Sequence, residues 1–102
     1  MARQSQRLPI DLYVNKIVNG VPHLTRTRDL SREGIFLHRL LEPRVPRDAH
    51  VAVEFELPSG ELIWTEAEVV YQDAGNGGVG LRFKDMAPRD RRRIDALVAE
   101  AA

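Results

Sequence analysis

Two short groups of polar residues near the N-terminus have the types and spacing that could bind a ligand. The first holds Arg3 and Arg7, four positions apart in the run RQSQR. The second is the run DLSREG, in which Asp29, Ser31 and Gly34 follow the pattern D-x-S-x-x-G. Arginine is suited to flat, bidentate recognition of phosphates or bases. Asp and Ser bond to nearby backbone amides and Gly supplies positive φ, so the second group taken alone is read as a corner between two strands.

The composition limits the kind of protein that carries these groups. With 102 residues, 43% apolar and 29% charged, the chain has the size and balance of one soluble globular domain. The absence of cysteine excludes disulfides and thiol nucleophiles, and the three histidines show no metal-ligand spacing. No apolar run approaches a membrane span, and the N-terminal MARQSQR lacks the apolar core of a signal peptide. We therefore expect a cytoplasmic protein without a membrane span.

Most of the chain alternates between apolar and polar residues with the period of two that is typical of half-buried strands. We expect strands over residues 10–18, 21–28, 35–40, 50–57, 61–73 and 79–83. Lys16 interrupts the apolar face of the first strand, and Ile63, Ala67 and Tyr71 are expected to share one face of the fifth. Asn19-Gly20 is a strong hairpin signal, because both residues tolerate positive φ.

The period changes near the C-terminus. Ile94, Leu97, Val98 and Ala101 recur at i, i+3, i+4 and i+7, which is one face of a helix, and Pro88 suits its first turn. No β-α-β alternation appears, so a parallel sheet is not expected. The sequence predicts an all-β domain with one terminal helix: a small antiparallel barrel or sandwich of about six strands, with the helix over an open end.

The chain carries no pattern typical of an enzyme. Ser31 lacks the glycines of a nucleophile elbow, and Walker, GxGxxG and HExxH motifs are absent. Glu66 and Glu68 alternate on the outward face of a strand, where carboxylates are solvated rather than catalytic. The four arginines between residues 89 and 93 are interpreted as a solvated helix face. We expect no catalytic residue, no metal site and no cofactor.

The two polar groups in combination point further. The order of RxxxR, a strand–turn–strand and DxSxxG opening a third strand resembles the PilZ domain family. The run RLPIDLYV is similar to the family's entry into its first strand, and EAEVVYQ and GGVGLRFKDM to its last two strands. The resemblance covers nearly the whole chain, so we expect a single PilZ domain over residues 1–102. Its parts would be an arm at 1–8, a barrel at 9–86 and a helix at 87–101.

The resemblance implies a six-stranded antiparallel β-barrel that binds the bacterial second messenger cyclic di-GMP. Arg3 and Arg7, which match RxxxR, would grip the ligand's guanine and phosphates. Asp29 and Ser31 would contact guanine edges, and Gly34 would shape the turn. The chemistry agrees, since arginine forks onto guanine O6 and N7. A carboxylate accepts the N1-H and N2-H of guanine, which adenine cannot offer as a pair.

A mechanism and partners follow from this expectation. Residues 1–8 carry no apolar pattern, so we expect a mobile arm that folds over the bound dinucleotide. The protein would be a cyclic di-GMP receptor or adaptor, a monomer or weak dimer, that signals through an unidentified protein partner.

Two alternatives stay open. One is a PilZ-like adaptor that works through protein contacts without binding the nucleotide. The other is a small barrel that binds single-stranded RNA or DNA, which would need aromatic platforms and a positive face. The net charge is zero and Trp64 is the only large ring on a plausible outward strand face, so no nucleic-acid partner is expected.

Overall fold

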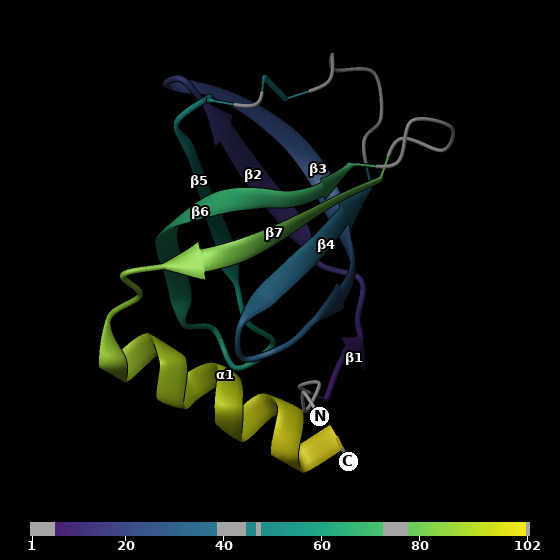
Figure 1. Ribbon diagram of the computed structural model, residues 1–102. Helices are drawn as coiled ribbons and strands as arrows, with labels where there is room; N and C mark the ends of the chain where they lie inside the picture. Colours follow the sequence, from purple (N-terminus) through teal and green to yellow (C-terminus); the bar gives the residue numbers. More distant parts are fainter. Residues whose placement is uncertain (1–5, 39–44, 47, 73–77, 102) are drawn as a thin grey trace, which may run out of the picture.

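The computed structural model describes residues 6–38, 45–46, 48–72 and 78–101. These residues form seven strands and one C-terminal helix (Figure 1). In chain order the elements are β1 (Leu8–Pro9), β2 (Tyr13–Val18), β3 (Val21–Leu30), β4 (Gly34–His38), β5 (Val51–Glu56), β6 (Leu62–Gln72), β7 (Gly78–Lys84) and α1 (Pro88–Ala101).

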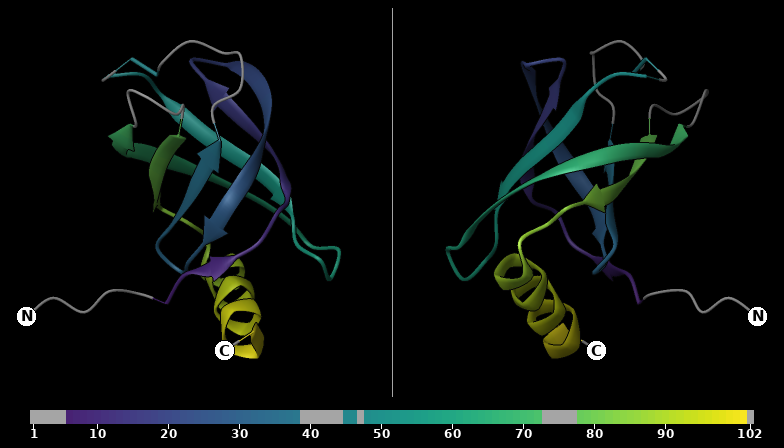
Figure 2. Two further views of the ribbon diagram at one scale, coloured as in Figure 1. Left: turned by 90° about the vertical axis from the view of Figure 1, so that its right-hand side faces the viewer. Right: turned by 60° about the vertical axis from the view of Figure 1, so that its left-hand side comes forward.

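Six of the strands close into an antiparallel barrel. The sheet runs in the order β3, β2, β5, β6, β7, β4, and a further pairing between β3 and β4 closes it. β1 is an extra short strand that pairs with β3, and α1 lies across the lower end of the barrel (Figures 1 and 2). The predicted fold, a six-stranded antiparallel barrel capped by one terminal helix, is confirmed.

Inward-facing apolar side chains fill the barrel, as the alternation predicted. On β5, the side chains of Val51, Val53 and Phe55 are buried. On α1, the predicted apolar face turns Ile94 and Val98 onto the same core. Each fully buried side chain of this size contributes about 1.5–3 kcal/mol relative to an exposed one. The helix is therefore part of the core that holds the lower end closed.

The Asn19-Gly20 turn joins β2 to β3, as predicted. Val18 pairs with Val21 across it, and φ is 49° at Asn19 and 84° at Gly20. The Asn19 N–H donates to the carbonyl of His50 at 2.8 Å, and the Asn19 Oδ1 accepts the N–H of His50 at 2.9 Å. The turn is thus also tied to the start of β5.

The first predicted strand, over residues 10–18, begins later than expected, and a separate two-residue strand, β1, precedes it. β2 begins at Tyr13 rather than at residue 10, because one buried threonine takes over the bonds of the preceding segment. The N–H of Leu12 donates to Oγ1 of Thr27 at 2.8 Å, the N–H of Thr27 donates to the carbonyl of Leu12 at 2.9 Å, and the Thr27 hydroxyl donates to the carbonyl of Ile10. The chain therefore bends between β1 and β2.

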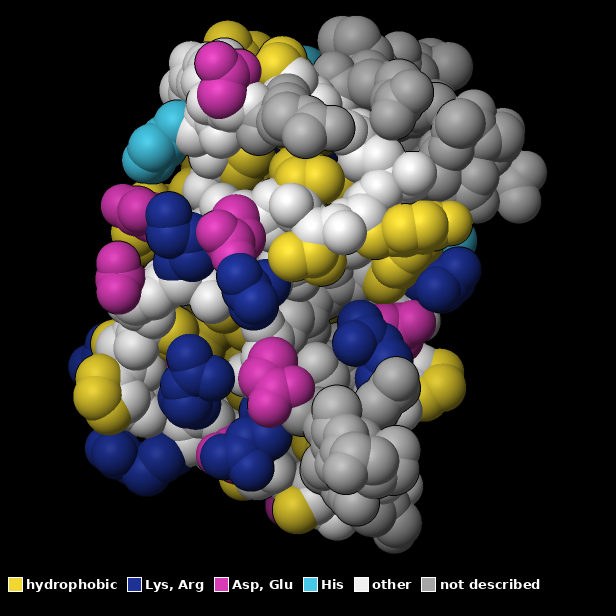
Figure 3. Space-filling model, viewed as in Figure 1, with side chains coloured by type: hydrophobic (Ala, Val, Ile, Leu, Met, Phe, Trp, Pro, Cys, Tyr) yellow, Lys and Arg dark blue, Asp and Glu magenta, His cyan; other side chains and the backbone are white. Residues whose placement is uncertain are grey.

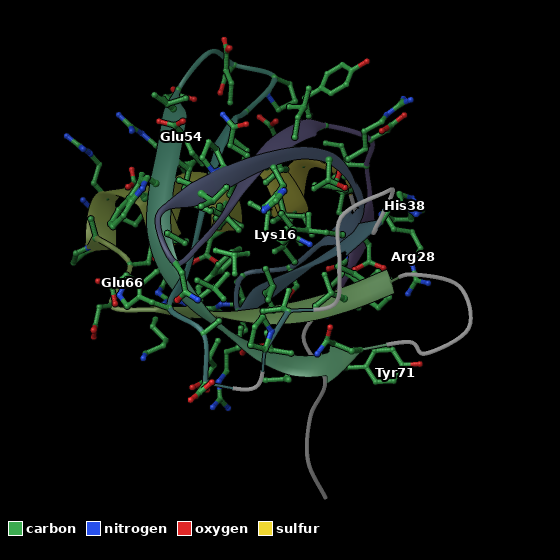
Figure 4. All side chains as sticks on the ribbon, turned by 90° about the horizontal axis from the view of Figure 1, so that it is seen from above. Lys16, Arg28, His38, Glu54, Glu66 and Tyr71 are labelled. Carbon is green, nitrogen blue, oxygen red and sulfur yellow. The ribbon has the colours of Figure 1, made fainter. Side chains whose placement is uncertain are left out.

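The polar residue in the apolar face of β2 also lies inside the barrel. Lys16 has no exposed surface, and Figure 4 shows it within the ring of strands seen from above. A buried ammonium group is costly unless it is paired, and Lys16 does have an interaction partner.

A β-bulge in β6 changes which way its last residues point. Val69 pairs with Leu81 and Tyr71 with Gly80, so two steps along β6 match one along β7. The extra residue reverses the alternation. Tyr71 is consequently 54% exposed, and the prediction that it shares the inward face with Ile63 was wrong.

Candidate ligand-binding site

The short strand β1 brings the arginine of the first motif to the aspartate of the second. Leu8 pairs with Leu30 and Pro9 with Asp29, so Arg7 lies beside Asp29. Nε and Nη2 of Arg7 contact Oδ1 of Asp29 at 2.7 and 2.6 Å. Two motif residues 22 positions apart in sequence therefore form one ion pair.

Asp29 has guanidinium groups at both of its oxygens. Its Oδ2 lies 3.4 Å from Nε of Arg28, while its Oδ1 contacts Arg7. A register shift in β3 between Thr27 and Asp29 accompanies this arrangement, as expected where a bulge re-aims side chains. The Asp29 side chain is 14% exposed and that of Arg7 46%. The carboxylate is thus held in one orientation at the surface, with both oxygens directed at N–H donors.

Ser31 organises the turn that follows β3. Its hydroxyl oxygen accepts the backbone N–H of Glu33 at 3.3 Å and that of Gly34 at 3.2 Å. Its own N–H donates to the carbonyl of Gly34 at 2.9 Å. Ser31 is buried, so its hydroxyl bonds to its own turn. In this geometry Ser31 fixes the position of the chain directly after Asp29.

Gly34 is needed for a different reason from the one expected of a corner glycine. Among the glycines of the described segments, only Gly20 and Gly60 have positive φ, so the expectation that Gly34 supplies positive φ was wrong. A Cβ at Gly34 would overlap the backbone carbonyl oxygen of Leu81 on β7. Gly34 therefore permits the close approach of two strands.

An aromatic and cationic group beside Asp29 was not predicted from the sequence. The guanidinium of Arg28 lies 3.7 Å from the ring centroid of Phe36, and that ring lies 6.1 Å from the ring of Tyr71. A Cβ on Gly78 would overlap the Phe36 ring, so the glycine leaves the space that the ring occupies. Arg28 and Tyr71 lie on the same side of the barrel in Figure 4. The β6 bulge made this group hard to foresee, because it reverses the position of Tyr71.

An open pocket borders the same region. Its volume is about 600 Å³, and its lining residues are Pro9, Ile10, Asp11, Arg26, Thr27, Arg28 and His38. It therefore lies along β3 next to the Arg7–Asp29 pair. The remaining predicted site residue, Arg3, lies outside the described residues.

The turn of the second motif is also tied to α1. Nε of Arg32 lies 3.2 Å from Oδ1 of Asp95, and Nη1 of Arg91 donates to the carbonyl of Arg32 at 2.9 Å. In the view of Figure 3, Lys and Arg side chains gather over the lower part of the molecule, where α1 lies in Figure 1. Nη1 of Arg93 also donates to Oδ1 of Asp90 at 3.2 Å. Arg91 and Arg93 therefore form structural contacts, and the interpretation of the helix arginines as a solvated face is incomplete.

The described residues offer neither a metal site nor a membrane-spanning helix. No group of three or more His, Cys, Asp or Glu side chains within the described ranges could hold a metal ion. In that part of the chain no helix has the length and apolar character to span a membrane.

Comparison with known proteins identifies the family. The family model described as PilZ domain matches residues 2–100, and the chain belongs to this family. PilZ domains are receptor and adaptor domains for cyclic di-GMP rather than a catalytic family. A sequence search of functionally described proteins gave no significant match.

Solved structures share the fold. The Bacillus subtilis inhibitor of motility, MotI/DgrA, superposes with a TM-score of 0.83 at 19% identity, over 98% of this chain and 51% of that one. The present chain therefore spans about half the length of that protein. The PilZ domain of CeSA from a cellulose-synthesizing bacterium superposes with a TM-score of 0.69 at 20% identity, over 94% of this chain and 97% of that one. At these identities the likeness establishes the fold alone.

Proposed function

We propose that this chain is a cyclic di-GMP receptor that binds the dinucleotide at a site made of Arg3, Arg7, Asp29, Ser31 and Gly34 and signals through a protein partner. The observation that carries the proposal is the Arg7–Asp29 pair, in which both motifs meet at one surface point. A site for phosphate alone would avoid a carboxylate. Cyclic di-GMP carries guanines as well as phosphates, and a guanine edge offers N–H donors that the carboxylate can accept.

Binding would exchange the partners of this pair. The guanidinium of Arg7 would turn to a phosphate or to guanine O6 and N7, and the oxygens of Asp29 would accept guanine N1-H and N2-H. An exposed ion pair contributes only about 0–1 kcal/mol, whereas a hydrogen bond to a charged group contributes about 1.5–3 kcal/mol. The exchange is therefore favourable for a guanine ligand.

Ser31 and Gly34 support this exchange from behind. The Ser31 hydroxyl is already satisfied within the turn, so its part is to hold Asp29 in place. Gly34 keeps β4 close to β7 and so fixes the other end of the turn. The corner would thus be preformed when the ligand arrives.

The stack of Arg28, Phe36 and Tyr71 would extend the site. Unpaired bases stack on aromatic rings and on the planes of guanidinium groups. Tyr71 is 54% exposed and Arg28 already lies against an aromatic ring, so both can meet a second base. This would place one guanine at Asp29 and the other over the stack.

The arm that carries Arg3 would fold over the dinucleotide. β1 anchors the end of this arm on β3, directly beside Asp29. Amide hydrogen exchange of residues 1–8 should slow when cyclic di-GMP is added, and equal exchange in both conditions would contradict a moving arm. A receptor of this kind would act in the cytoplasm, as a monomer or weak dimer.

Titration calorimetry tests the receptor function directly. Cyclic di-GMP should bind the wild-type protein, while GTP and a short oligonucleotide should not. Arg92→Ala removes an exposed arginine of α1 and should leave the affinity unchanged, whereas Arg7→Ala should weaken it more than tenfold. If no heat is observed with the dinucleotide at high micromolar concentration, the protein is not a receptor and the adaptor alternative takes its place.

A further inference from the structure

The side of the barrel opposite the candidate site carries an unusual group of exposed apolar side chains. Its members are Tyr13 on β2, Leu24 on β3, and Leu62 and Trp64 on β6, which are 65%, 60%, 59% and 51% exposed. Large apolar residues exposed singly are ordinary, but here they lie in two neighbouring pairs, Tyr13 with Leu24 and Leu62 with Trp64, and grouped apolar side chains mark an interaction surface. The earlier expectation that Trp64 is the only large ring facing outward was wrong.

The strand register places two glutamates of β5 between these apolar side chains. The first row, consecutive across β3, β2, β5 and β6, is Leu24, Asn15, Glu54 and Trp64. The next row has Arg26 opposite Tyr13 and Glu56 opposite Leu62. We call Tyr13, Leu24, Glu54, Glu56, Leu62 and Trp64 the apolar–acidic face. With strands about 4.8 Å apart it is about 14 Å wide, which suits one peptide segment.

The acidic part of this face, on β5 and β6, lies away from the candidate ligand-binding site. Figure 4, seen from above, shows Glu54 on the side of the barrel opposite Arg28 and Tyr71. The barrel order agrees, because β5 is separated from β4 by two strands in either direction. Glu54 and its neighbours on β6 therefore lie away from the dinucleotide site, whereas Tyr13 adjoins Arg26, which lines the pocket beside that site.

The charge of the face selects its occupant. Within the described ranges, Glu54 and Glu56 form no ion pair. They are two positions apart on β5, so their side chains lie on the same side of the strand. Two neighbouring carboxylates repel each other, and a basic partner would relieve that repulsion. The same carboxylates disfavour the phosphates of nucleic acid and the anionic headgroups of lipid membranes.

A second copy of the chain is a poorer occupant than another protein. In a two-fold dimer whose axis passes beside Glu54 and Glu56, these carboxylates would meet those of the other copy, which repel. A one-way docking of the α1 arginines of one copy on this face of another would be a heterologous contact, which leads to rings or open chains rather than a closed dimer.

One anchor of the face is held in position by its neighbours. The guanidinium of Arg26 lies 5.3 Å from the ring centroid of Tyr13. Nε of Arg26 in turn donates to Oδ1 of Asp11 at 2.8 Å, and these hydrogen bonds raise the pKa of Arg26. A side chain that is already oriented loses less conformational entropy on binding.

We infer that the apolar–acidic face docks a segment of a partner protein in which basic side chains are flanked by apolar ones. The inference rests on the proposed function, because a receptor of this kind must signal through a protein partner, and it specifies the chemistry of that partner. The docking itself requires no nucleotide.

A peptide-display experiment tests the inference with the full chain. A library of random twelve-residue peptides would be selected on the wild-type protein, and the enriched peptides synthesised and titrated by Trp64 fluorescence. We expect enriched peptides rich in Arg or Lys and in apolar residues. Their affinity should fall at least tenfold in Glu54→Lys/Glu56→Lys and in Trp64→Ala. The control Asp48→Lys/Glu100→Lys makes the same change in net charge at exposed positions elsewhere and should bind normally.

Several outcomes would overturn the inference. They are no enrichment, enrichment of acidic peptides, or equal binding by the Glu54→Lys/Glu56→Lys and control variants. Concentration-dependent dimers that Trp64→Ala abolishes would show that a second copy occupies the face. Titration of the Glu54→Lys/Glu56→Lys variant with cyclic di-GMP separates this inference from the receptor function: the nucleotide affinity should match wild type, whatever the peptides do.

Discussion

The two sides of the barrel treat their charged residues in opposite ways. On the side of β1, β3 and β4, Asp29 is held between Arg7 and Arg28, and the turn behind it is bonded through Ser31. On the side of β2, β5 and β6, Glu54 and Glu56 stand among exposed apolar side chains, with no ion pair among the residues that the structure describes.

This difference indicates two kinds of recognition. A carboxylate already surrounded by N–H donors can exchange them for the donors of a guanine edge at little cost. Carboxylates set in an apolar surface instead favour a partner that brings both a cation and apolar area. A receptor that reads a nucleotide on one side and a protein on the other would need both.

The strongest way to break the ligand-binding side is to force its strands apart. Gly34→Val should lower the free energy of unfolding by about 3 kcal/mol, because overpacking at a close backbone contact costs about 1–3 kcal/mol or more. Urea denaturation measures this. Gly60→Ala is the control: it adds a methyl group in open space at φ 101°, so its cost should be near 1 kcal/mol. Equal losses in both variants would contradict the packing role of Gly34.

Removing the charge of the central carboxylate should weaken the nucleotide selectively. Asp29→Asn keeps the shape but offers one acceptor where guanine presents two donors, so cyclic di-GMP affinity should fall by about 1.5–3 kcal/mol, or more than tenfold. Titration calorimetry measures this, with Glu54→Gln on the opposite side as the matched control. Similar losses in the two variants would show that the ligand does not distinguish the sides.

The stack beside Asp29 should have a smaller effect. Tyr71→Ala removes one surface on which a base can lie, and we expect cyclic di-GMP to bind about 1 kcal/mol more weakly, at the lower end of the stacking range. Trp64→Ala removes an exposed ring from the other side and should leave the affinity unchanged. A loss in Trp64→Ala that equals the loss in Tyr71→Ala would remove the stack from the site.

The smallest effect is expected where charge is removed from the apolar–acidic face. Glu54→Gln/Glu56→Gln relieves a like-charge repulsion at the surface. The free energy of unfolding, measured by thermal denaturation, should therefore rise by no more than about 0.5 kcal/mol. A clear loss of stability would mean that these glutamates stabilise the fold, which would contradict their role in binding a partner.

The barrel and its helix could be predicted because local patterns determine them. The alternation in β5 and the helical spacing of Ile94 and Val98 each reflect which side chains reach the core. Asn19-Gly20 fixed one hairpin through its own backbone preferences. Such features depend on neighbours in sequence, so the sequence displays them.

The features that were missed depend on distant contacts. β1 has two residues and exists because β3 offers an edge, and the register shift at Tyr71 arises between β6 and β7. The need for glycine at position 34 lies in a carbonyl on another strand. The family resemblance assigned Arg7 and Asp29 to one ligand site, but their direct ion pair was not predicted, because no local pattern links residues 22 positions apart.

Cyclic di-GMP binding at the Arg7–Asp29 pair can be observed directly by titrating the ¹⁵N-labelled wild-type protein with the dinucleotide and recording amide NMR spectra. The proposed function predicts shifts at Leu8, at Asp29–Gly34 and at Tyr71, with the Trp64 indole N–H unchanged. Shifts centred on Glu54 and Trp64, or no shifts at a saturating dinucleotide concentration, would contradict it.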